Sequence, residues 1–251
     1  MENGLNNLEN VLFVVLLYKN EKFNVRAPYD IEIMGKKMWE WVALAGNGAN
    51  IKTIPCTKDS DVVSLIKQFV KNEKYAVALY SDTPLVTKST ILEILEYFKQ
   101  KDLSVLKFKR GFVFDCEYLL NCDRVLCDSN PLFDSDEFEA VEDFVKLAKV
   151  TEEIRNRILN FHMQNGVQIL DFNSTYIDCD VVIEVNVVIY PNNHISGNSY
   201  IGEYVKLFPN NVIKNSIISN GAVLKGAYVV ESRISENAII EPFEKVIDCD
   251  R

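Results

Sequence analysis

Asp82 is the acidic residue whose place in the sequence most favours chemistry. It follows the apolar run "YAVALY" at 75–80, and Thr83 and Pro84 come directly after it. Such a run is typical of a buried strand, and threonine with proline is typical of the turn that ends one. Ligands of parallel sheets bind at the carboxyl ends of the strands. Asp82 is therefore a candidate ligand-binding residue, and an acid that only caps a strand-to-helix turn is the competing interpretation.

Cysteine and histidine chemistry is not indicated. The six cysteines lie at irregular spacings without a CxxC pair, and the two histidines, His162 and His194, are distant from most of them. Structural zinc sites need such ligands at short, regular spacings. We therefore expect free thiols in a reducing cytosol and a cytoplasmic location. The cysteines are Cys56, Cys116, Cys122, Cys127, Cys179 and Cys249.

Charge and hydropathy argue against two classes of partner. The net charge is −9 with dispersed acids, whereas binding of nucleic acid needs clustered lysine and arginine. The long apolar run "VLFVVLLY" at 11–18 is shorter than the roughly 20 residues that span a bilayer. The preceding "MENGLNNLEN" has no basic residue of the kind that opens a signal peptide. We expect neither a nucleic-acid partner nor a membrane anchor.

The elements that position Asp82 alternate between strands and helices. Continuous apolar strands separated by helices are typical of a parallel sheet that is covered on both faces. The expected strands are 11–18, 51–55, 75–80, 103–108 and 111–115. The expected helices lie near 36–45, 59–71 and 87–101.

Segment 135–165 is expected to be helical. Ser135 is a candidate cap before apolar residues at helical spacing, and Thr151 is a candidate cap for a second stretch. Gly166 suits the end of a helix. The spacing fits an arm that joins two domains, and it fits equally an amphipathic helix packed on either one.

A repeat follows this segment. The phrases "YPNNHI" at 190–195 and "FPNNVI" at 208–213 are offset by eighteen residues. A six-residue period predicts a hexapeptide solenoid in which three short strands make one coil. An antiparallel sandwich, the alternative, has no reason to keep this period. The stride shortens in places after Ile213, as is usual at solenoid corners. The periodic aliphatics are Ile177, Ile183, Ile189, Ile195, Ile201, Leu207 and Ile213.

Several phrases carry a family resemblance. The segments "GVQILDFNSTYIDCDVVIEVNVVIYP" at 166–191 and "SRISENAIIEPFEKV" at 232–246 resemble the bifunctional N-acetylglucosamine-1-phosphate uridylyltransferase/glucosamine-1-phosphate acetyltransferase family. "YSDTPLV" at 80–86, "GFVFDCEYLL" at 111–120 and "MGKKMWEWV" at 34–42 resemble its first domain.

The resemblance implies an α/β fold. A Rossmann-like nucleotidyltransferase domain with a mostly parallel sheet comes first, then a helical arm, then a left-handed parallel β-helix of hexapeptide repeats. We place a reduced nucleotidyltransferase-like domain at 1–134, a helical linker at 135–165 and the β-helix at 166–251.

The resemblance also implies a site. In the family's YGDxPL phrase the aspartate binds the magnesium ion that bridges the nucleotide phosphates and the sugar phosphate, which assigns Asp82 to Mg²⁺ and, with Ser81 and Thr83, to a nucleotide. "AVED" at 140–143 falls where the family has GVN[ND], so Glu142 or Asp143 is the second metal candidate. The solvated face of an amphipathic helix is the other interpretation of these two acids.

Other family motifs are missing. After Leu17 the first glycine is Gly35, so the glycine-rich phosphate loop is absent, and Tyr29 stands after Pro28 in place of a lysine. "SDVVSLIKQF" at 60–69 replaces the base-reading loop. Two residues between Phe108 and Gly111 replace the long insertion that holds the sugar. We expect weak magnesium affinity at most.

This pattern predicts a degenerate homologue that is non-catalytic and regulatory or scaffolding, with a nucleotide or sugar nucleotide as ligand or an active relative as partner. An active nucleotidyltransferase with altered specificity and a hexapeptide-repeat acyltransferase are the alternatives. We expect no acetyl transfer, because the family's catalytic histidine lies beyond its equivalent of "EPFEKV" and His194 lies at a turn. Left-handed β-helices commonly form trimers, so we expect a homotrimer.

Overall fold

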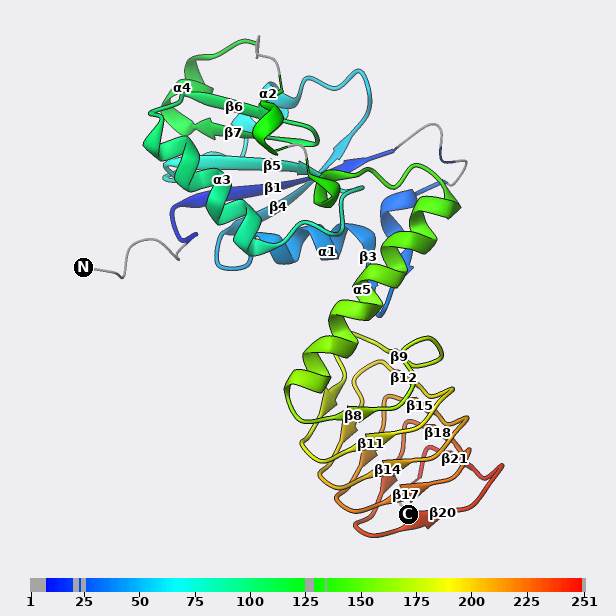
Figure 1. Cartoon of the computed structure of the whole chain (residues 1–251). Coiled ribbons are helices and arrows are strands. Elements are labelled where there is room, and N and C mark those ends of the chain that lie inside the picture. The colour runs from blue at the N-terminus through cyan, green and yellow to red at the C-terminus, as the bar shows by residue number, and fades with distance from the viewer. Residues whose placement is uncertain (1–7, 20–22, 24–25, 125–128, 134, 250–251) are drawn as a thin grey trace, which may run out of the picture. The chain divides into compact units, whose positions relative to one another are not determined.

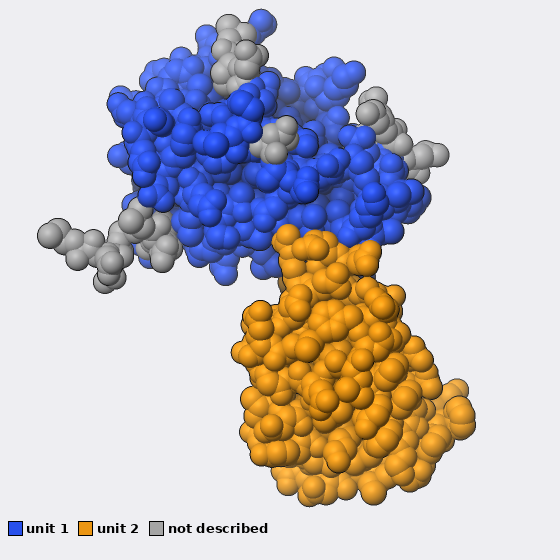
Figure 2. Space-filling view, viewed as in Figure 1, with its two compact units in different colours: residues 1–32, 37–150 blue, residues 33–36, 151–251 orange. Residues whose placement is uncertain are grey.

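The structure is a computed structural model that describes residues 8–19, 23, 26–124, 129–133 and 135–249. Cys127 lies outside these residues. The chain divides into two compact units, one of residues 1–32 and 37–150 and one of residues 33–36 and 151–251 (Figure 2). Among the described residues, no helix has the length and apolar character needed to cross a membrane.

The first unit is built on a five-stranded sheet of order β4-β1-β5-β7-β6 (Figure 1). β1 pairs in parallel with both β4 and β5, and β7 is antiparallel to both β5 and β6. Four strands therefore run one way and β7 runs the other, which confirms the mostly parallel sheet. The strands are β1 (Val11–Tyr18), β4 (Asn50–Cys56), β5 (Tyr75–Tyr80), β6 (Val105–Phe108) and β7 (Gly111–Asp115).

Helices cover both faces of this sheet, as the continuous apolar strands predict. Leu12, Val14 and Leu16 of β1 belong to the core cluster that contains α2 and α4. Phe13 and Val15 belong to the cluster of α1 and α3 on the opposite face. Successive side chains of a strand point to opposite faces, so a strand buried on both sides is apolar throughout. The helices are α1 (Met38–Ala45), α2 (Val62–Lys67), α3 (Lys88–Gln100) and α4 (Cys116–Asn121).

Some predicted helix bounds are wrong. The segment 135–165, expected to be helical throughout, contains the 3-10 turn η3 (Asp136–Phe138) and then α5 (Phe144–Gln164). The other 3-10 turns of the described residues are η1 (Pro28–Asp30) and η2 (Pro131–Phe133). Ser135 precedes η3 without capping it through its side chain. Thr151 lies inside α5, where the buried residues Ile154 and Ile158 continue the apolar stripe past it. The predicted domain boundaries after residues 134 and 165 stay predictions.

The second unit is a parallel β-helix of the left-handed class, which confirms the repeat. Its strands stack into three sheets, ordered β10-β13-β16-β19, β20-β17-β14-β11-β8 and β21-β18-β15-β12-β9, and all their pairs are parallel. The strands are β8 (Gln168–Ile169), β9 (Tyr176–Ile177), β10 (Val182–Ile183), β11 (Val188–Ile189), β12 (His194–Ser196), β13 (Tyr200–Ile201), β14 (Lys206–Leu207), β15 (Val212–Lys214), β16 (Ile217–Ile218), β17 (Val223–Leu224), β18 (Tyr228–Val230), β19 (Arg233–Ile234), β20 (Ile239–Ile240) and β21 (Lys245–Ile247).

The periodic aliphatics all point into this prism and are buried. Ile195 lies in register with Ile213, eighteen residues on, whereas Ile213 lies in register with Val229, sixteen residues on. The shorter repeat after Ile213 thus comes from a coil with fewer residues, in which the aliphatic side chain still points into the prism.

Two buried asparagines explain the repeated "PNN". Asn193 and Asn211 are fully buried, and Asn211 Nδ2 donates to Asn193 Oδ1 at 2.9 Å. Asn211 Oδ1 accepts from Ala227 N at 2.8 Å, and Asn193 Nδ2 donates to Tyr190 O at 2.7 Å. The preceding Asn210 is exposed, with a left-handed φ of 72° that asparagine tolerates. The second asparagine of each pair therefore ties one coil to the next.

We predict that Asn211→Ala lowers the free energy of unfolding by about 2 kcal/mol or more, because it leaves several buried backbone and amide groups without partners. Asn210→Gly is the matched control, since glycine adopts the left-handed backbone freely. Urea denaturation of the two variants provides the measurement. Equal stability of both variants would contradict the role of the ladder.

A second prediction concerns His162 on α5, which is 4% exposed. Burial lowers the pKa of its imidazole below the ordinary value. The unfolded chain then binds more protons below roughly pH 6.5 than the folded chain does, so stability should fall as the pH drops through that range. His162→Gln should remove part of this fall, and His194→Gln, at an exposed position, should not. The urea midpoints of the wild type and both variants are measured as a function of pH. The same pH dependence in the wild type and in His162→Gln would exclude the effect.

Candidate functional site at the carboxyl edge of the sheet

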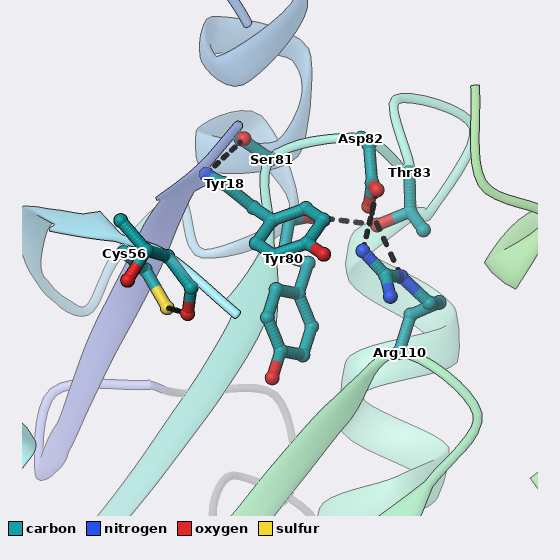
Figure 3. A network of polar contacts seen from close by, with 8 residues as sticks. Tyr18, Cys56, Tyr80, Ser81, Asp82, Thr83 and Arg110 are labelled. Carbon is teal, nitrogen blue, oxygen red and sulfur yellow. Dashed lines mark hydrogen bonds and ion pairs between the residues drawn. The ribbon is translucent and has the colours of Figure 1, made fainter. Parts of the chain in front are cut away.

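Three parallel strands end together at one edge of the sheet. Tyr18 lies in register with Cys56 of β4, and Leu16 with Tyr80 of β5. The rings of Tyr18 and Tyr80 meet edge to face, with centroids 5.4 Å apart (Figure 3). Parallel pairing thus brings Cys56 and the two tyrosines, the last residues of β4, β1 and β5, to the edge where ligands of such sheets bind.

The tripeptide after β5 is buried at this edge. Ser81 and Thr83 are fully buried, and Asp82 is 5% exposed. Ser81 Oγ accepts from Tyr18 N at 3.0 Å, and Thr83 Oγ1 donates to Tyr80 O at 3.0 Å (Figure 3). The Ser81 hydroxyl thus bonds to the end of β1 and the Thr83 hydroxyl to the end of β5, and together they fix the backbone on either side of Asp82.

Arg110 closes on the Asp82 carboxylate. Its Nε donates to Asp82 Oδ1 at 3.1 Å, and a terminal guanidinium nitrogen donates to Oδ2 (Figure 3). The guanidinium carbon lies 4.2 Å from the centroid of the Tyr80 ring and 5.3 Å from that of Tyr18. Two side-by-side hydrogen bonds from one planar group are a geometry that a guanidinium provides and an ammonium group does not, and both tyrosine rings add cation–π contacts.

Burial has the largest effect on the pKa values of the titratable groups at this edge. Burial raises the pKa of the Asp82 carboxyl, and the charge of Arg110 opposes that rise. Burial also raises the pKa values of the Cys56 thiol and the Tyr80 phenol. A thiol with a raised pKa is a poor nucleophile, so Cys56 serves as a packing residue.

Arg110 comes from the shortened segment between β6 and β7. Only Lys109 and Arg110 lie between Phe108 and Gly111, where the resembled family has its long insertion. Tyr80 N donates to Arg110 O at 3.2 Å, which holds the turn against the end of β5. A side chain at position 111 would place its Cβ 2.5 Å from the Phe108 ring, so glycine is required there.

The sequence reasoning missed Arg110. Its signal was present, because strands at 103–108 and 111–115 leave only a two-residue turn. In the structure β7 is antiparallel to β5 and β6, which places this turn at the edge where β5 ends.

The two other predicted metal ligands have different positions. Val141 N donates to Asp82 O at 2.9 Å, which brings the half-buried Glu142 into the neighbourhood of Asp82, and its charge adds to the rise in the pKa of Asp82 after the larger effect of burial. Asp143 is exposed, and its Oδ1 accepts from Lys146 N at 2.7 Å at the start of α5. Glu142 is thus near Asp82, whereas Asp143 caps a helix.

The arrangement does not fit a divalent cation. The Arg110 guanidinium donates to both oxygens of Asp82 and balances its charge, so a divalent cation at this carboxylate would be repelled by a neighbouring positive group. In the part of the chain that the structure describes, no group of three or more acidic, histidine or cysteine residues could hold a metal ion.

Comparison with known proteins identifies relatives. No model of a known protein family matches the chain. Bifunctional protein GlmU of Clostridium kluyveri is 40% identical over 108 residues, which are 43% of this chain and 24% of that protein. GlmU of Clostridioides difficile is 38% identical over the same shares. GlmU of Clostridium botulinum is 27% identical over 242 aligned residues, covering 70% of this chain and 53% of that protein.

The chain thus spans between about a quarter and about half the length of the curated relatives it matches. A mostly parallel sheet followed by a parallel β-helix agrees with the motifs that indicated this family. Over part of its length the chain is therefore similar to the curated proteins named bifunctional protein GlmU.

Proposed function

We propose that the chain is a degenerate sugar-1-phosphate nucleotidyltransferase homologue with a regulatory or scaffolding role. The observation that carries this proposal is the contact of Arg110 with both oxygens of Asp82. In nucleotidyl transfer the reacting phosphates need a metal ion and preorganised donors. A carboxylate whose charge is already balanced by a guanidinium attracts such an ion less, and the positive guanidinium repels it.

The shortened turn supports the same conclusion for the sugar. Lys109 and Arg110 replace an insertion that holds the sugar in the resembled family. The segment 60–69, where the family reads the base, contains the short helix α2 instead, and Asp61 caps it by accepting from Val63 N at 3.1 Å. Contacts for metal, base and sugar are thus replaced together.

The nucleotide-binding role of Ser81, Asp82 and Thr83 is proposed only as weak, because both hydroxyls serve the backbone. The metal roles of Glu142 and Asp143 are proposed in the same sense. Any magnesium affinity of the wild type should therefore be small.

We predict that purified protein releases no pyrophosphate at a useful rate from UTP, magnesium and N-acetylglucosamine-1-phosphate. Loss of one preorganised donor typically lowers such rates about 10²–10³-fold, and here several are replaced. A bifunctional GlmU relative is the positive control. Steady release that Asp82→Ala abolished would contradict the proposal and favour an active enzyme with altered specificity.

The proposal includes a homotrimer formed through the β-helix. One sheet carries a register column of outward side chains that runs Tyr176, His194, Val212, Tyr228 and Lys245. Three of them are partly apolar and 41%, 37% and 44% exposed, namely Tyr176, Val212 and Tyr228, and such a column is suited to burial against another subunit. A cyclic trimer would repeat one heterologous interface three times.

We predict that light scattering gives three times the monomer mass and that Val212→Lys lowers it. Lys206→Glu, which alters an outward residue of a different sheet, is the control and should leave the mass unchanged. A monomeric wild type at micromolar concentration would exclude the trimer.

A further inference from the structure

At the Asp82–Arg110 pair a buried carboxylate faces a cation, as in a metal site, but the cation is a side chain of the protein itself. The side chain of Asp82 is 7% exposed, and that of Arg110 is 22% exposed. A carboxylate buried to this degree requires a positive partner or a bound proton. Arg110 supplies the positive charge at the two oxygens where a metal ion would bind.

The guanidinium is held on more than one side. Asp82 accepts two of its hydrogen bonds in the plane, and the Tyr80 and Tyr18 rings lie 4.2 Å and 5.3 Å from its central carbon. Figure 3 shows Arg110 directed from the β6–β7 turn toward Asp82, with the two tyrosines beside it. The aromatic faces stabilise a cation there, because they are electron-rich.

The backbone of Arg110 is fixed as well. Its carbonyl accepts from Tyr80 N at 3.2 Å, so the turn is tied to the strand that carries Asp82. At Gly111 a Cβ would lie 2.6 Å from Ala78 O, which explains how the turn approaches β5 so closely. Because the turn is tight and its backbone is held by β5, the Arg110 side chain has a defined position relative to the Asp82 carboxylate.

A second carboxylate belongs to this neighbourhood. The hydrogen bond from Val141 N to Asp82 O at 2.9 Å places Glu142 next along the chain. Glu142 is close enough for its charge to act on the Asp82 carboxyl, whose pKa it raises after the larger effect of burial. Two neighbouring carboxylates are a composition that can bind a divalent cation.

We propose that Arg110 is a built-in cation that takes the place of a divalent metal ion at Asp82 and makes this edge of the sheet independent of metal. This inference rests on the proposed function, because it explains how a nucleotidyltransferase-like sheet keeps its buried aspartate without the catalytic ion. Removal of the guanidinium should leave Asp82 without a counter-charge and uncover a latent site for Mg²⁺ or Mn²⁺ at Asp82 and Glu142.

The test compares the wild type with Arg110→Gln, Arg110→Lys and the double variant Arg110→Gln/Asp82→Asn. Thermal unfolding is followed during titration with millimolar MgCl₂, and Mn²⁺ binding is followed by electron paramagnetic resonance. We expect at most a small rise in the Tm of the wild type over this range. Arg110→Gln should show a saturable rise of a few degrees and bind Mn²⁺, since a ligand that binds only the folded state stabilises it.

The two remaining variants are matched controls. Arg110→Lys keeps a positive charge near Asp82 and should bind little Mn²⁺. The double variant removes the carboxylate together with the guanidinium and should bind none at this site. If Arg110→Gln is unfolded without metal, the inference requires that Mg²⁺ or Mn²⁺ restore its folded circular dichroism signal.

Two outcomes would overturn the inference: saturable Mg²⁺ stabilisation of the wild type equal to that of Arg110→Gln, or an Arg110→Gln variant that neither binds metal nor is rescued by it. Pyrophosphate release is measured on the same samples. Metal binding by the wild type as strong as that of Arg110→Gln, without turnover, would remove the inference and leave the absence of catalysis intact. Turnover by the wild type would remove the proposed function.

Discussion

The buried carboxylate of Asp82 is the constraint on which the candidate site depends. The polar contacts around it serve either to hold the turn that carries it or to neutralise it: Ser81 and Thr83 hold the backbone, and Arg110 supplies the charge. Removing one partner of a buried ion pair typically costs about 3–5 kcal/mol, because the remaining charge has no water to replace its partner. Changes at Arg110 and Asp82 should therefore be strongly coupled.

The contact between Asp82 and Arg110 depends on the length of the turn between β6 and β7. A two-residue connection between β6 and β7 brings Arg110 to the end of β5, and a long insertion in that place would carry the chain elsewhere. The short turn thus places a cation, Arg110, beside the buried carboxylate. The β-helix follows its own constraint, in which Asn193 and Asn211 satisfy the inward backbone groups of successive coils.

Much of the fold could be predicted from local pattern. The strands at 11–18, 75–80 and 111–115 agree with the structure residue for residue, because strands buried on both faces are apolar throughout. Position 82 follows from the end of such a strand. The partner of Asp82 could not be predicted in this way, since the contact depends on how β7 pairs with β5. Thr151 was misjudged as a cap because burial of neighbouring residues outweighs its weak helix propensity.

Crystals of the protein grown with MnCl₂ and a nucleoside triphosphate would test the central claim most directly, through the anomalous signal of manganese at the carboxyl edge of the sheet. The account predicts that Arg110 remains on both oxygens of Asp82 and that no anomalous peak lies beside them. A manganese peak coordinated by Asp82, with Arg110 turned away toward solvent, would contradict it.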